Sequence, residues 1–284
     1  MKGNTHLSSI ERIGGLTVVI PTLNSENYLG AALNSLQFLR NQGANVVVVD
    51  SHSDDNTVEI AKTGSDSILL FPKGNMYGAI NHGLRSAKTE WLAYLNSDDL
   101  VYPRTIYREL LSMADSCDLL YGNIDFVNED GHFLHDYLMP PPSDILPLAG
   151  MRVNAVPPQG TLFRKRVFDT LGGFDTTFRL AADHDFFVRA ALQGFRYGKV
   201  AHPPLAAFRL HGSQLSHTRW EEHTREAKLI AEKATPSTSS FQRRIAYCTF
   251  KLRNIRSFLI RILRGHTIHG SYRMRGCMDI PTTS

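Results

Sequence analysis

The chain has 284 residues, of which 42% are hydrophobic and 20% are charged, so it can bury a core and is not an intrinsically disordered protein. Its three cysteines, Cys117, Cys248 and Cys277, form no CxxC pair, which argues against a disulfide scaffold and a cysteine-rich zinc module. Residues 1–15 lack the apolar segment of a secretory signal, and no run of 18 apolar residues occurs. We therefore expect a cytoplasmic protein without a simple membrane span.

The net charge of +4 is unevenly distributed along the chain. Residues 241–284 contain nine Lys or Arg and one acid, a net charge of +8, so residues 1–240 carry 22 basic and 26 acidic side chains, a net charge of −4. A strongly basic segment joined to a mildly acidic body indicates that this segment meets an anionic surface.

The first hundred residues alternate between strand and helix patterns. Short apolar runs predict buried strands, and apolar residues three or four apart predict amphipathic helices. Buried strands separated by helices indicate an α/β fold with a mostly parallel sheet covered on both faces. The expected strands are 16–20, 46–49, 67–71 and 90–95, and the expected helices are 27–41, 58–62, 77–87 and 101–113.

The rest of the chain has weaker periodicity. We expect a strand over 119–126, a short strand over 160–163, a helix over 164–171 that stops at a Gly-Gly pair, and a helix over 183–192. The Ser/Thr/Pro-rich stretch 235–240 predicts a linker. The expected organisation is a domain over 1–233, with a nucleotide-binding half at 16–103 and an acceptor or catalytic half at 104–217, a linker at 234–240 and a basic helical tail at 241–284.

Polar residues follow four of the predicted strands. In an open α/β sheet, ligands bind beyond the carboxyl ends of the strands, so these side chains are expected to meet at one edge. The alternative is that they are ordinary loop and helix-capping residues. The residues are Thr22, Asn24, Asp50, Lys73, Asn96, Asp98 and Asp99.

Two acidic segments carry potential chemistry. The hard oxygen donors at 96–99 could hold Mg²⁺ or Mn²⁺ beside substrate phosphates, or they could cap the helix that follows. Asp183 and Asp185 are two residues apart and cannot share a helix face, so one is free to point into a cleft while the other caps or pairs with Arg189. A carboxylate in a cleft could accept a proton from a hydroxyl group, whereas His184 is interpreted as structural or adjacent to substrate.

Seven short motifs, in order and spacing, resemble the family-2 glycosyltransferases of the GT-A fold over about residues 16–217. They are Pro21-Thr22-Leu23-Asn24, Val48-Val49-Asp50 with the polar residues 51–55, Asn81-His82-Gly83, Leu95-Asn96-Ser97-Asp98-Asp99, Gln159-Gly160-Thr161, Gly172-Gly173-Phe174-Asp175 and Ala182-Asp183-His184-Asp185. The resemblance ends near Arg209-Leu210-His211.

The resemblance implies an inverting, metal-assisted transferase that uses a nucleotide sugar, with Mg²⁺ or Mn²⁺ as cofactor. Thr22, Asn24, Asp50 and Asn81 would bind the donor, with Asp50 accepting from the base, and Asn96 would lie near the ribose. A UDP-sugar is favoured, and GDP- and dTDP-sugars stay open.

The resemblance also assigns the charged groups of the site. Asp98 would ligate the metal and Asp183 would be the catalytic base, while Lys73 and His211 are further candidates near the donor. Asn96 replaces the first Asp of the family's DxD motif, which lowers the negative charge beside the cation. Ala182 stands where many relatives carry Glu, which makes Asp183 easier to ionise.

The basic tail has apolar residues three and four apart over 241–265, with most arginines on the other side. This pattern predicts a helix that lies on an anionic membrane through 241–275, at the inner face of the cytoplasmic membrane. A helix packed on the catalytic domain and a coiled-coil partner are the alternatives. Nucleic acid is not expected, because the body lacks a basic face.

These patterns together predict a glycosyltransferase that acts on a glycan or lipid-linked acceptor in surface polysaccharide biosynthesis. The alternative is a non-catalytic module that binds a nucleotide sugar or serves as a scaffold. A sugar nucleotidyltransferase is poorly supported, because no glycine-rich, arginine-containing loop follows the first strand.

Overall fold

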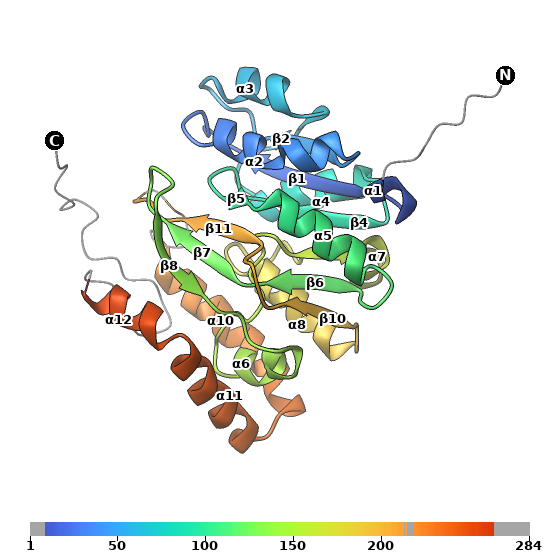
Figure 1. Cartoon of the computed structure of the whole chain (residues 1–284). Coiled ribbons are helices and arrows are strands. Elements are labelled where there is room, and N and C mark those ends of the chain that lie inside the picture. The colour runs from blue at the N-terminus through green and yellow to red at the C-terminus, as the bar shows by residue number, and fades with distance from the viewer. Residues whose placement is uncertain (1–8, 213, 215–218, 264–284) are drawn as a thin grey trace.

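The computed structural model describes residues 9–212, 214 and 219–263. Its centre is a seven-stranded sheet in which β9 runs antiparallel to β4 and β6 and the other neighbours are parallel (Figure 1). This confirms the predicted α/β class with a mostly parallel sheet. In spatial order the strands are β10 (Tyr197–Val200), β6 (Leu119–Gly122), β9 (Leu162–Arg164), β4 (Trp91–Tyr94), β1 (Leu16–Thr22), β2 (Asn45–Asp50) and β3 (Ser67–Leu70).

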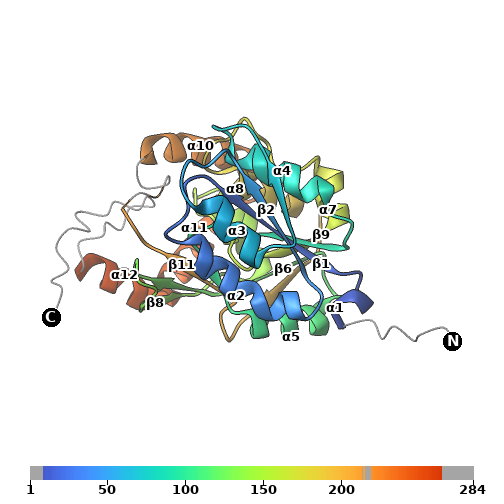
Figure 2. The same ribbon diagram turned by 90° about the horizontal axis from the view of Figure 1, so that it is seen from above.

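Helices cover both faces of this sheet, so its central strands are apolar on both sides. Figure 2 shows α2 and α5 on one face and α4, α7 and α8 on the other. A Cβ atom on Gly83 of α4 would lie 2.7 Å from Val19, so glycine lets this helix approach β1 closely. The helices are α1 (Ser9–Arg12), α2 (Leu29–Asn41), α3 (Thr57–Gly64), α4 (Met76–Ser86), α5 (Pro103–Met113), α6 (Ile145–Ala149), α7 (Lys165–Leu171) and α8 (Ala182–Leu192), with the 3₁₀ turn η1 (Pro142–Asp144).

A second, four-stranded sheet has the order β5 (Leu100–Val101), β11 (Ala206–Arg209), β7 (Ile124–Val127) and β8 (Phe133–Tyr137). The single strand expected over 119–126 is wrong, because the chain changes sheets at Asn123. The Asn123 side chain accepts from the backbone N–H of Met139 at 2.8 Å and donates to the carbonyl of Ala201. Its amide thus replaces ladder hydrogen bonds at the point where β6 ends and β7 begins.

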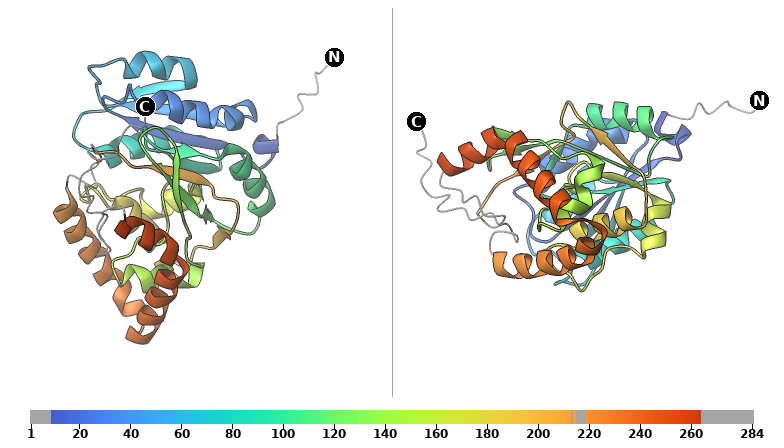
Figure 3. Two further views of the ribbon diagram at one scale, coloured as in Figure 1. Left: turned by 60° about the vertical axis from the view of Figure 1, so that its left-hand side comes forward. Right: turned by 90° about the horizontal axis from the view of Figure 1, so that it is seen from below.

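The C-terminal part forms α10 (Trp220–Ala234), the turn η2 (Thr235–Ser237), α11 (Ser240–Arg253) and α12 (Ile255–Leu263). The stretch expected as a linker is ordered by a capping box, in which Ser239 and Gln242 exchange hydrogen bonds at the start of α11. Phe250 of α11 is buried, and α11 packs on α6 while α12 packs on β8 (Figure 3). Residues 264–284 of the expected tail lie outside the described residues. Within the described ranges, no helix has the length and hydropathy of a membrane span.

Candidate active site

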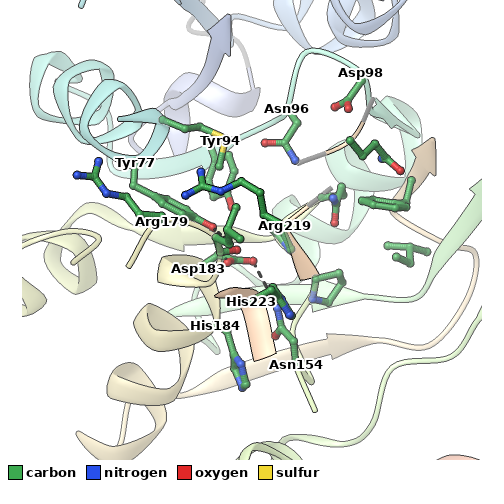
Figure 4. A pocket seen from close by; sticks show the side chains of 18 of the residues that line it. Tyr77, Tyr94, Asn96, Asp98, Asn154, Arg179, Asp183, His184, Arg219 and His223 are labelled. Atoms are coloured by element: carbon green, nitrogen blue, oxygen red, sulfur yellow. Dashed lines mark hydrogen bonds between the residues drawn. The ribbon is translucent and has the colours of Figure 1, made fainter. Parts of the chain in front are cut away.

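A cavity of about 1030 Å³ lies at the carboxyl ends of β1 and β4 and extends to β7, α8, α10 and α11. Because β1 and β4 are parallel neighbours, the residues that follow them meet at one sheet edge. Asp98 and Asp183 both line this cavity, and they are the only carboxylates among the described residues that do so. The convergence that the motifs predicted is therefore present (Figure 4). The other predicted site residues that line the cavity are Thr22, Asn24, Asn96 and His211.

Asp98 stands at the rim of the cavity on a firmly held loop. Its Oδ2 lies 2.8 Å from Nε2 of His211, and its backbone carbonyl accepts from Nε of Arg209 at 2.8 Å. The next residue, Asp99, is fully buried and accepts from Gln159 Nε2 at 2.8 Å and from the backbone N–H of Arg209 at 3.0 Å. Burial, and then the charge of Asp98, raise the pKa of Asp99 well above its usual value. Asp99 thus positions the loop, while Asp98 is the acid that faces the cavity.

The side-chain amide of Asn96 has its nitrogen in a hydrogen bond and its oxygen without a partner among the described residues. Its Nδ2 donates to Asp99 Oδ2 at 3.1 Å. Its Oδ1 is buried and has no hydrogen-bond partner among the described residues. A buried polar atom of this kind normally has a partner, so Asn96 Oδ1 is a candidate contact for a bound group.

Asp183 lies in the first turn of α8 and is 7% exposed. Its carboxylate accepts from the hydroxyl of Tyr77 at 2.8 Å and from Nδ2 of Asn154 at 3.4 Å. Burial raises the pKa of Asp183, while the Tyr77 hydrogen bond, the backbone N–H of His184 and the charge of His223 act in the opposite direction. Burial also lowers the pKa of His184 to about 3, so this imidazole is neutral at pH 7.

The two acids at the start of α8 have separate roles, as the two-residue spacing predicted. Asp185 points away from the cavity lining and is fully buried. Its Oδ2 accepts from Nε of Arg189 at 2.6 Å, and its Oδ1 pairs with Nζ of Lys233 at 2.6 Å. Arg189 also donates to the carbonyls of Leu171 and Gly173, so this ion pair fixes α8 against the end of α7.

Asp50 lies behind the cavity lining and holds Thr22, which is part of that lining. It is 1% exposed, and its oxygens accept from the hydroxyl of Thr22 at 3.1 Å and from the backbone N–H of Ser53 at 2.9 Å. Thr22 itself lines the cavity, as does Asn24, whose Oδ1 accepts from the N–H of Asp54 at 2.9 Å. Asn24 has a φ of 50°, a left-handed conformation that Asn tolerates better than most residues.

Three of the expected donor-binding residues, Asp50, Asn81 and Lys73, lie outside the cavity lining. Asn81 is 2% exposed and bonds to the backbone of Phe174 through both its Nδ2, at 2.8 Å, and its Oδ1, at 2.9 Å. It therefore joins α4 to the loop that precedes α8. Lys73 forms an exposed ion pair with Asp54 at 2.9 Å.

Sequence reasoning did not identify the residues that hold Asp183 in place. Glu226 of α10 is buried and accepts from three consecutive backbone N–H groups, those of Arg179, Leu180 and Ala181, at 2.7 to 2.9 Å. This contact fixes the segment that enters α8. The available signal was an acid on the apolar stripe of an amphipathic helix, beside Ala227, Ile230 and Ala231.

The chain resembles known glycosyltransferases in sequence. A protein from Rickettsia felis described as an uncharacterized glycosyltransferase is 27% identical over 188 residues, covering 61% of this chain and 31% of that protein. The chain thus spans about a third of the length of this relative. A "PGL/p-HBAD biosynthesis glycosyltransferase" from Mycobacterium bovis BCG is 26% identical over 215 residues, covering 71% of this chain and 79% of that protein.

The fold is similar to that of solved glycosyltransferases. Staphylococcus aureus TarS, residues 1–349 in complex with UDP, superposes with a TM-score of 0.59 at 18% identity, covering 85% of this chain and 72% of that one. The fold is therefore the GT-A fold. The model of the family described as "Glycosyl transferase family 2" matches residues 17–172, more than half of the chain. With this match, the chain belongs to glycosyltransferase family 2.

Proposed function

We propose that this enzyme transfers a sugar from a nucleoside diphosphate donor to a hydroxyl of a glycan or lipid-linked acceptor, with inversion at the anomeric carbon, in surface polysaccharide biosynthesis. The observation that carries the proposal is the pair of carboxylates in one cavity. Asp98 lies beside His211 at the rim, whereas Asp183 is buried beside Tyr77. Two acids in different surroundings suit two different tasks.

Asp183 is the proposed base. Its carboxylate takes the proton of the acceptor hydroxyl as that oxygen forms a bond to the anomeric carbon. The bond between this carbon and the diphosphate oxygen breaks on the opposite face, and the electron pair leaves with the diphosphate. A single displacement needs one base and no protein nucleophile, so it gives inversion. The raised pKa of Asp183 makes this carboxylate a better proton acceptor than an exposed one.

The donor is proposed to bind at the edge formed by Thr22, Asn24 and Asn96, which line the cavity after β1 and β4. TarS was crystallised with UDP and with UDP-GlcNAc. This supports a uridine nucleotide as the donor of the present enzyme. Asp50 would then act by holding Thr22 and the turn at Ser53, through the hydrogen bonds that it accepts from both.

A divalent cation, Mg²⁺ or Mn²⁺, fits the Asp98 side of the cavity. Asp98 and Asn96 would hold it, since one offers a carboxylate and the other a buried amide oxygen without a partner. The described residues contain no group of three His, Cys, Asp or Glu that could hold a metal by themselves, so donor phosphates would complete the shell. When bound, the cation neutralises the charge that develops on the leaving diphosphate.

The outer face of α11 and α12 is proposed to rest on an anionic membrane. Six apolar side chains there are between 45% and 71% exposed, and Arg244, Arg253 and Arg256 are exposed among them. The apolar spacing of three and four also fits a coiled coil, but the exposed arginines beside these apolar residues favour an anionic surface over a second copy of this basic segment. Apolar and cationic side chains together match an anionic bilayer surface. The apolar residues of this outer face are Phe241, Ile245, Leu252, Ile255, Leu259 and Ile262.

The test of the catalytic proposal is Asp183→Asn, assayed with a panel of nucleotide sugars by release of the nucleoside diphosphate. Loss of a general base lowers the rate by about 10²- to 10⁴-fold. Since burial disfavours the ionised form of Asp183, the neutral amide should not lower the melting temperature at pH 7. Binding of the nucleotide, followed by thermal shift, should persist. Full activity of the variant would show that Asp183 is not the base and would leave a binding module as the better description.

A further inference from the structure

We infer that the acceptor is an amphiphile whose hydroxyl-bearing head reaches Asp183 while an apolar aliphatic or aromatic group occupies the far end of the same cavity. This inference rests on the proposed function and names its acceptor. The cavity, at about 1030 Å³, is at the upper limit of pockets that hold one ligand. It therefore has room for more than the nucleotide sugar.

The end of the cavity remote from the nucleotide edge is mostly apolar, and Lys251 in its lining has its Nζ over the rings of Tyr247 and Phe258, at 5.2 and 3.9 Å from their centroids. It is formed by β7, the segment after β8, the loop between α6 and β9, and α11. We call it the apolar end, and its lining includes Ile124, Met139, Met151, Val153, Tyr247 and Phe250. A pocket wall of this kind favours an apolar ligand group, because removing apolar surface from water is its main source of affinity.

The wall of the apolar end is preformed by contacts within the protein. The ring of Tyr137 packs edge-to-face on Phe126 at 5.6 Å and on Phe250 at 5.6 Å. Asn254, between α11 and α12, exchanges two hydrogen bonds with the backbone of Leu138, at 2.7 and 2.9 Å. The helices expected as a separate tail thus complete the cavity, and their inner face lies behind the outer face proposed to meet a bilayer.

One short loop connects the apolar end to the proposed base. Met151 and Val153 line the apolar end, and the adjacent Asn154 donates to Asp183 at 3.4 Å. Arg152 within this loop has a φ of 61°, a conformation that is uncommon outside glycine. An acceptor whose hydroxyl lies at Asp183 would therefore place its next atoms along Val153 and Met151, toward Tyr247.

A purely polar acceptor would be penalised at this end. Hydroxyl groups that leave water for an apolar wall lose hydrogen bonds, and that loss costs free energy. An alkyl or aryl group gains from the same transfer, and each buried methylene increases affinity about three- to fourfold. The geometry therefore selects acceptors by the apolar group attached to the head.

The experiment titrates the full chain with alkyl β-D-glucosides from butyl to octyl, below their micelle concentrations, by calorimetry with UDP present. The expected result is an affinity that rises about three- to fourfold per methylene, with a negative heat-capacity change. Met151→Glu places a charge at the apolar end at a residue that is 36% exposed, and it should weaken octyl glucoside binding about tenfold or more. Val153→Thr, a near-isosteric change, should also lower the gain in affinity per methylene.

The matched control is Leu70→Glu, which places the same charge at an exposed apolar residue outside both the cavity lining and the outer face, where Leu70 is 60% exposed. It should leave the titration unchanged. A flat chain-length profile, or an equal loss of affinity in Leu70→Glu and Met151→Glu, would overturn the inference. The titration needs no turnover, so it stays valid if Asp183→Asn retains activity and the catalytic proposal fails. If affinity does not depend on chain length while Asp183→Asn is inactive, the amphiphilic acceptor is rejected and the catalytic proposal stands.

Discussion

The hydroxyl of Tyr77 favours the ionised form of the proposed base, and its removal gives a sharp test of the mechanism. The Tyr77 hydroxyl donates to Asp183 Oδ1 at 2.8 Å and lies 3.2 Å from the carbonyl oxygen of Leu180. Tyr77→Phe keeps the ring, which packs against Phe174 at 5.9 Å, and deletes only the hydroxyl. The hydrogen bond favours the ionised carboxylate, whereas burial already raises the pKa of Asp183.

The size of the effect follows from the energy of that hydrogen bond. A hydrogen bond to a charged group contributes about 1.5–3 kcal/mol, and one pKa unit corresponds to about 1.4 kcal/mol. The pKa of Asp183 should therefore rise by about one to two units in Tyr77→Phe. Because the base acts in its ionised form, the acid limb of kcat/KM should move to higher pH by the same amount, while the plateau at higher pH is retained.

The assay measures release of the nucleoside diphosphate across the acid and neutral range. Tyr94→Phe is the matched control, because Tyr94 is another buried tyrosine that lines the cavity and has no hydrogen bond to Asp183 among the described contacts. An unshifted acid limb in Tyr77→Phe, or the same shift in both variants, would refute the assignment of Asp183 as the base.

Three further predictions concern the cation, the fold and the membrane. UDP is expected to raise the melting temperature only when Mn²⁺ or Mg²⁺ is present, and Asp98→Asn should abolish this increase. The melting temperature of the variant without ligand should equal that of the wild type. An increase with UDP and cation that persists in the variant would contradict the metal assignment. Arg189→Leu leaves the buried Asp185 with Lys233 as its remaining ion-pair partner. The free energy of unfolding, measured in urea, should therefore fall by about 3 kcal/mol. A decrease below about 1 kcal/mol would mean that the Asp185–Arg189 pair does not stabilise α8. The double variant Leu252→Glu with Leu259→Glu should lose sedimentation with vesicles that contain anionic phosphatidylglycerol, and wild-type binding should weaken as salt increases; undiminished sedimentation would exclude the outer face.

Several features of the candidate site were predictable from local patterns alone. The buried strands end in polar residues, and parallel pairing brings Thr22 and Asn96 to one edge. The two-residue spacing of Asp183 and Asp185 predicted that their side chains point in different directions, because residues two apart do not share a helix face. The observed pair of Asp185 with Arg189 and the exposure of Asp183 to the cavity confirm this prediction.

The sequence by itself determined the α/β class and the alternation of β1 to β4 with the helices between them, because these follow from apolar periodicity and from neighbours a few residues apart. The tertiary structure alone decided the sheet change at Asn123 and the anchoring of residues 179–181 by Glu226. It also decided that α11 has two faces, with Phe250 inward and Leu252 outward. These features depend on partners 16 to more than 100 residues away, and local patterns carry no information about such contacts.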